Sequence, residues 1–155
     1  MSRLSDQAQP AVAKLVQADE DQLFEQLGVR AQAIAQRPEL AGSFEPAVTY
    51  DQVAMGPLDA VRDIGRRIYR RWEREAYLLV CGQEDEESGD RESLMAAFGI
   101  DGSAVAAILA AGLVSQLGLA PAIAAVVAAI LVRRFFRPAY EEFCAAWGER
   151  LEATA

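Results

Sequence analysis

The sequence predicts an all-α protein, a single-domain bundle of about six helices with an apolar helical hairpin at its centre. Three observations favour this fold class. Apolar residues recur at three-to-four spacing in several segments, no alternating β pattern of any strength is present, and the stretch from Ala104 to Val132 carries no charge. A chain of 155 residues, 52% of them hydrophobic, is large enough to bury one core.

We expect one helical domain over residues 1–155, with residues 1–9 flexible. Pro10 suits the first turn of a short helix. Asp19 and Gln22 have the spacing of a capping box, so an amphipathic helix is expected over 20–36. Residues 38–56 lack helical periodicity and predict a loop.

The longest predicted helix covers residues 57–81, and Gly82 supplies its C-terminal stop. Its expected apolar stripe consists of Leu58, Val61, Ile64, Ile68, Trp72, Ala76 and Leu79. An acidic loop over 83–90 and a short helix over 90–98 follow.

The apolar segment predicts two helices, over 104–117 and 121–136, which together form the central hairpin. Asp101 suits the N-cap of the first helix, and Pro121 suits the first position of the second. A last amphipathic helix is expected over 138–152. The hairpin residues that we expect to lie in the core, or in a membrane, are Val114, Leu117, Pro121, Ile123, Val127 and Ile130.

This apolar segment must be covered by the chain itself, by a partner or by lipid, because each large aliphatic side chain gains about 1.5–3 kcal/mol on burial. A transmembrane hairpin is disfavoured, since each arm is shorter than the roughly 20 residues that cross a bilayer. Arg133, Arg134 and Arg137 follow the segment and fit either a membrane flank or the end of a helix. We therefore expect two core helices, with insertion of 104–132 into lipid, as in a pore-forming toxin, as the alternative.

Several kinds of chemistry lack support in the sequence. The chain has no histidine, which removes the commonest general base and metal ligand, and it has no glycine-rich phosphate loop. We expect no catalytic, cofactor or metal site. The net charge of −8 argues against nucleic acid as a partner. Cys81 and Cys144 are expected to be two reduced, buried cysteines, and the polar N-terminus, with no signal-peptide pattern, predicts a cytoplasmic protein.

The most distinctive polar feature is a set of six arginines within 57–81, at Arg62, Arg66, Arg67, Arg70, Arg71 and Arg74. Asp63 and Arg67, and Arg71 and Glu75, have the i, i+4 spacing of ion pairs. The set is typical of an ordinary salt-bridged surface, but it also fits a binding site for an acidic protein or, less well, for nucleic acid or lipid headgroups. The acidic segment 84–92 is an alternative partner within the chain.

A well-specified fold without a catalytic constellation leads to one functional hypothesis. We expect a non-enzymatic helical interaction protein, such as an adaptor, regulator or accessory subunit, with the six arginines as its candidate binding residues. Its partner is expected to be another protein, with an acidic surface as one option, and a homo-oligomer is a further option. The alternative is the membrane-active protein described above.

Overall fold

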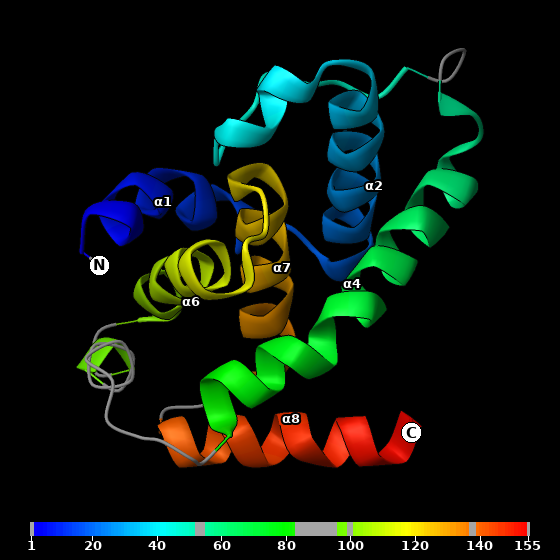
Figure 1. The fold of residues 1–155 in the computed structure, drawn as a ribbon. Helices are drawn as coiled ribbons and strands as arrows, with labels where there is room; N and C mark the ends of the chain where they lie inside the picture. Colours follow the sequence, from blue (N-terminus) through cyan, green and yellow to red (C-terminus); the bar gives the residue numbers. More distant parts are fainter. Residues whose placement is uncertain (1, 52–54, 83–95, 99–100, 137–138, 155) are drawn as a thin grey trace.

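The apolar segment forms a helical hairpin at the centre of a bundle, as the sequence predicts (Figure 1). The computed structural model describes residues 2–51, 55–82, 96–98, 101–136 and 139–154. These residues form six α-helices and one 3-10 helix, with no strand among them: α1 (Ser2–Leu15), α2 (Glu20–Gln36), η1 (Pro38–Gly42), α4 (Leu58–Cys81), α6 (Gly102–Leu117), α7 (Pro121–Phe135) and α8 (Tyr140–Thr154). The all-α fold class is confirmed.

Capping residues fix the start and end of α6 and the start of α7. The carboxylate of Asp101 accepts a hydrogen bond from the backbone amide of Ala104 at 2.9 Å. This bond, and a second from the Ser103 hydroxyl, lower the pKa of Asp101 below its ordinary value. Gly118 closes α6 in the left-handed conformation, with φ of 73°, and Pro121 opens α7.

Helix α7 is the centre of the core, since every side chain from 124 to 131 is fully buried. Val127 and Ile130 lie in this stretch. The other four hairpin candidates lie nearer the turn and are only partly buried: Val114, Leu117, Pro121 and Ile123. None of the helices in the described ranges is both long enough and apolar enough to cross a membrane.

The other helices cover this hairpin on several sides (Figure 1). Helix α1 packs against α6 and α7, α2 lies between α7 and α4, and α8 crosses one end of the bundle against α4 and α7. The predicted arrangement of an apolar hairpin within amphipathic helices is therefore confirmed.

Helix α1 starts earlier than the sequence predicts. It begins at Ser2, so residues 2–9, expected to be flexible, are helical, and Pro10 lies inside the helix instead of in its first turn. Packing explains the difference: Ala8 is fully buried against the core, and the Gln9 side chain donates a hydrogen bond to the Ser103 hydroxyl at 3.0 Å. Contacts with α6 thus outweigh the local preference of proline.

Three predictions concern the segments on either side of α4. The segment 38–56, predicted as a loop, begins with the 3-10 helix η1. The acidic loop over 83–90 and most of the short helix over 90–98 lie outside the described residues.

The buried side of α4 is rotated from the predicted stripe. Its buried residues are Val61, Gly65, Tyr69, Glu73, Ala76 and Val80, whereas the expected Ile68, Trp72 and Leu79 are only partly buried. Gly65 faces α2 so closely that an added Cβ would lie 2.0 Å from the carbonyl oxygen of Phe24. The glycine contact lets the helix backbones approach, and this approach decides which side of α4 is covered.

The expectation of two reduced cysteines is wrong in this structure. Cys81, at the end of α4, and Cys144, in α8, form a disulfide with their Cα atoms 5.7 Å apart. The two residues are 63 positions apart in the sequence, and no local pattern links them. Only the crossing of α8 over the end of α4 brings them together.

Candidate protein-binding surface on helix α4

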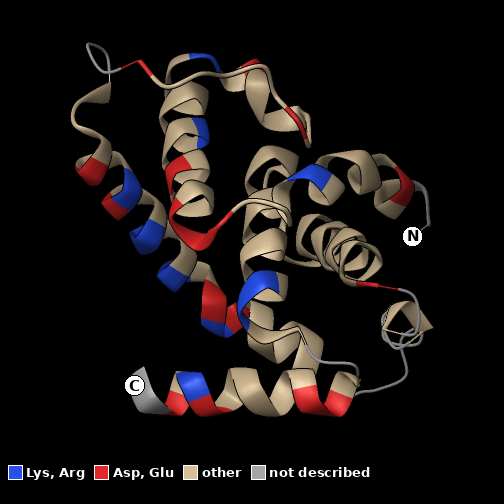
Figure 2. Cartoon of the chain, turned by 180° about the vertical axis from the view of Figure 1, so that it is seen from behind, with Lys and Arg blue, Asp and Glu red and all other residues tan. Residues whose placement is uncertain are grey.

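Helix α4 lies at the edge of the bundle, and its arginines follow one another along its length (Figures 1 and 2). Its buried positions recur at intervals of three and four residues, so the residues between them face away from the core. The six candidate arginines lie at these intervening positions. The structure divides them into two groups with different partners.

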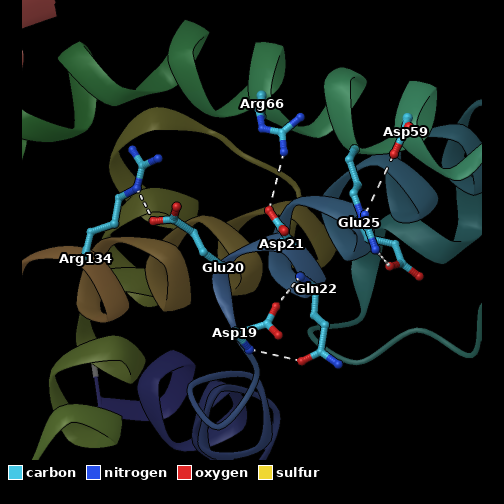
Figure 3. Close-up of polar contacts among 9 residues, drawn as sticks. Asp19, Glu20, Asp21, Gln22, Glu25, Asp59, Arg66 and Arg134 are labelled. Carbon is cyan, nitrogen blue, oxygen red and sulfur yellow. Dashed lines mark hydrogen bonds and ion pairs between the residues drawn. The ribbon is translucent and has the colours of Figure 1, made fainter.

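Arg62 and Arg66 both pair with carboxylates of α2, and Figure 3 shows the pair of Arg66 with Asp21. A guanidinium nitrogen of Arg62 lies 3.5 Å from a carboxylate oxygen of Glu25, and a nitrogen of Arg66 lies 3.4 Å from one of Asp21. The Arg66 guanidinium also lies 5.5 Å from the centroid of the Phe24 ring. Both side chains are therefore engaged within the protein.

Four arginines lie on the outer side of α4, and we call Arg67, Arg70, Arg71 and Arg74 the α4 arginine surface; all four are exposed. Arg67 forms the predicted pair with Asp63 at 3.4 Å, but both side chains are solvent-exposed, so the pair is weak.

Arg70, Arg71 and Arg74 form no ion pair within the described part of the chain. The predicted pair of Arg71 with Glu75 is not formed. Instead, the Arg71 guanidinium lies 5.5 Å from the ring of Trp72. No carboxylate of the described residues therefore compensates the positive charge on this side of the helix, and the acidic segment 84–92, the alternative partner within the chain, lies outside those residues.

An exposed apolar residue continues the α4 arginine surface. Leu78 lies four positions after Arg74, on the same side of the helix, and is 61% exposed. A single exposed aliphatic side chain is ordinary on a protein surface, so Leu78 adds only an apolar contact beside the arginines.

A second cluster, on the buried side of α4, was not predicted from the sequence. The Tyr69 hydroxyl donates a hydrogen bond to the buried Glu73 carboxylate at 2.8 Å, and the Arg134 guanidinium lies 5.1 Å from the Tyr69 ring. Arg134 also pairs with Glu20 (Figure 3). Burial, and then the Glu73 carboxylate, raises the pKa of Tyr69 above its ordinary value.

This buried cluster ties α4 to α7 and, through Glu20, to α2. The signal that it left in the sequence is a glutamate four residues after a tyrosine, which also occurs on ordinary helix surfaces. Only the burial of Glu73 distinguishes this cluster from such a surface pair.

Arg30 is a buried cation that the sequence did not single out. Its guanidinium donates hydrogen bonds to the carbonyl oxygens of Phe44, at 3.0 Å, and Ala122, at 2.9 Å. Burial lowers the pKa of Arg30 to about 10, against the opposing attraction of Glu45. Arg30 thereby connects α2 with the segment after η1 and with the start of α7, which is a structural role.

Other charged groups do not gather into a chemical site in the described residues. Glu141, Glu142 and Glu149 are exposed along α8. No group of three histidine, cysteine, aspartate or glutamate residues in the described ranges is placed to hold a metal ion. The α4 arginine surface is therefore the candidate that we develop.

Comparison with known proteins gives no relative: no protein-family model, curated protein or solved structure matches the chain.

Proposed function

We propose that the chain is a non-enzymatic helical interaction protein that binds an acidic segment of another protein through the α4 arginine surface. The observation that carries this proposal is the exposure of Arg70, Arg71 and Arg74 without a carboxylate partner in the described residues. Arg62, Arg66, Arg67 and Arg134, by contrast, each pair with an acid.

The overall charge supports a local, oriented interaction. The chain carries a net charge of −8, so an acidic partner is repelled by most of the molecule and attracted only where cations gather. Such an arrangement favours one docking orientation. It also disfavours a nucleic acid, whose binding requires a broad cationic surface.

The geometry of the surface suggests the form of the partner segment. Arg67, Arg71 and Arg74 recur at helical spacing and lead to Leu78. A partner helix with glutamates at matching intervals and one apolar residue beyond them complements this order. The cytoplasmic location expected from the sequence stays a prediction.

A binding measurement with a defined probe tests the proposal. The probe is a fluorescently labelled helical peptide carrying glutamates at three-to-four spacing and a terminal leucine, followed by anisotropy at low and physiological salt. Replacement of Arg70, Arg71 and Arg74 together by glutamine is expected to weaken binding by about 3- to 150-fold, since each exposed pair contributes about 0.2–1 kcal/mol. Higher salt is expected to weaken the wild-type complex.

The matched control replaces Lys14, Arg37 and Arg133 by glutamine, which removes the same charge from exposed positions outside α4. The proposal requires that this control bind like the wild type. It is overturned if the wild-type protein does not bind the peptide, or if both triple variants lose the same affinity. Sedimentation of the free protein tests a further alternative. If the wild type and the control are dimers and the α4 variant is a monomer, the surface binds a second copy of the chain instead.

A further inference from the structure

The disulfide Cys81–Cys144 joins the most peripheral helix of the bundle to α4. Helix α8 lies across one end of the molecule (Figure 1). It contacts α4 and α7, and no comparable packing against α1, α2 or α6 is present in the described chain. The disulfide links this helix covalently to an element that is distant in sequence.

The inner side of α8 covers a cluster of aromatic rings. Phe143 and Trp147 are fully buried, and Trp147 stacks on Phe135 of α7 with ring centroids 5.9 Å apart. Phe98 approaches Phe143 at 5.3 Å. Movement of α8 away from the bundle therefore exposes a large apolar surface to water.

Besides the disulfide, α8 is held by its buried Phe143 and Trp147 side chains and by a hydrogen bond that the Tyr140 hydroxyl donates to the carbonyl oxygen of Val80. The helix has 15 residues, close to the length below which isolated helices are marginal in water, and Gly148 lies within it. Within the described part of the chain, the buried indole nitrogen of Trp147 has no hydrogen-bond partner. Since water would satisfy that nitrogen, the closed position of α8 carries a polar cost that opening removes.

Cys81 and Cys144 are both only partly buried, so the disulfide lies near the surface of the bundle. We propose that the disulfide is a redox-controlled clasp, which holds α8 over the aromatic cluster when oxidised and releases it when reduced by a dithiol reductant. This inference is independent of the α4 arginine surface.

The reduction proceeds by two thiol–disulfide exchanges. A thiolate of the dithiol attacks one sulfur, the Cys81–Cys144 bond breaks, and a mixed disulfide forms while the other cysteine leaves as a thiolate. The second thiol of the reductant then attacks the mixed disulfide. The protein gains two electrons and two protons as two thiols, and the reductant becomes a disulfide.

The redox conditions of the cellular compartment determine whether the oxidised or the reduced state of the two cysteines is populated. Disulfides in reducing compartments are usually transient and linked to redox sensing, whereas in oxidising compartments they persist. A clasp of this kind therefore responds to a change in redox conditions wherever the protein meets both.

The test uses the full chain and the fluorescence of Trp147. The sequence contains two tryptophans, so Trp72→Phe leaves Trp147 as the single reporter. Acrylamide quenching and the emission maximum are compared before and after treatment with dithiothreitol, with thiol titration to confirm the redox state. On reduction we expect a red shift and stronger quenching, both reversed by reoxidation.

Hydrogen exchange of the wild-type protein gives a second readout that needs no tryptophan variant. Reduction is expected to remove amide protection over α8 while α2 and α7 stay protected. The double variant Cys81→Ala/Cys144→Ala is expected to resemble the reduced protein with or without dithiothreitol. The proposal is overturned if Trp147 and the α8 amides stay protected in the fully reduced chain, or if reduction unfolds α2 and α7 as well.

Discussion

Gly28 of α2 and Val61 of α4 approach so closely that a Cβ added to Gly28 would lie 2.1 Å from the carbonyl oxygen of Val61. Gly65 makes the reciprocal contact on α4 with the carbonyl oxygen of Phe24. In both cases the obstacle is backbone, which cannot rotate away as a flexible side chain can. The two helices thus meet through paired glycines, and this contact sets how far α4 can approach the bundle.

Replacing either glycine by alanine is expected to destabilise the protein. Gly28→Ala and Gly65→Ala should each lower the free energy of unfolding by about 1–3 kcal/mol or more, because the helices must separate to admit the methyl group. Urea unfolding measures the effect. Gly112→Ala in α6 is the control, since its Cβ would meet only Leu79 at 3.9 Å. That control should gain roughly 0.5–1 kcal/mol from helix propensity, and equal effects at all three positions would contradict the close contact.

The buried Arg30 provides a second test. Arg30→Leu removes the donors to Phe44 and Ala122, and the buried Phe44 carbonyl loses its partner. We expect the free energy of unfolding to fall by about 1–3 kcal/mol, with faster hydrogen exchange in the segment that follows η1. The exposed Arg37→Leu is the matched control. An unchanged stability in Arg30→Leu would show that the two carbonyl contacts contribute little.

The raised pKa of Tyr69 predicts that the contribution of this residue to stability falls at alkaline pH. Because the phenol pKa is raised in the folded state, the folded chain keeps its proton where the unfolded chain, titrating near 10.0, loses it. The contribution of Tyr69 to stability is therefore complete below that pH and declines as the pH rises above it. Unfolding of the wild type and of Tyr69→Phe should be measured across this range.

Below pH 10 or so, Tyr69→Phe should be less stable by about 1–3 kcal/mol, since the buried Glu73 loses its hydrogen-bond donor. The difference between the two proteins should narrow as the pH rises. Groups that do not contact Tyr69, Arg30 included, contribute equally to both proteins and cancel in the comparison. A difference that stays constant with pH would contradict the raised pKa.

The N-terminus of α2 carries a capping box that can be tested directly. The Asp19 carboxylate accepts a hydrogen bond from the backbone amide of Gln22 at 2.8 Å, and the Gln22 side chain accepts one from the Asp19 amide at 3.0 Å. Asp19→Ala should lower the free energy of unfolding by about 0.5–2 kcal/mol, and Asp19→Asn should restore most of it. The exposed Gln36→Ala, at the other end of α2, controls for loss of a polar side chain. Failure of asparagine to rescue would assign the effect to charge and not to capping.

Local patterns were reliable where the determining interaction lies within a few residues. The capping box at Asp19, the break at Gly118 and the start of α7 at Pro121 were all predicted correctly, because a side-chain cap, a left-handed glycine and a proline at the first position act on their own backbone. For the same reason the six arginines could be found in the sequence. Which of them remain available could not, since Arg62 and Arg66 are engaged by acids of another helix.

The sequence by itself determined that this protein is helical, that it has an apolar hairpin at its centre, and that cations gather on the helix beginning near residue 58. Only the tertiary structure decided that Glu73 and Arg30 are buried, that α4 turns Gly65 toward α2, and that Cys81 meets Cys144. The physical reason is range: helix formation depends on neighbours three and four positions apart, whereas these contacts join residues of different helices. The partner of each of these residues depends on how the helices cross, and the spacing of residues within one helix does not determine that crossing.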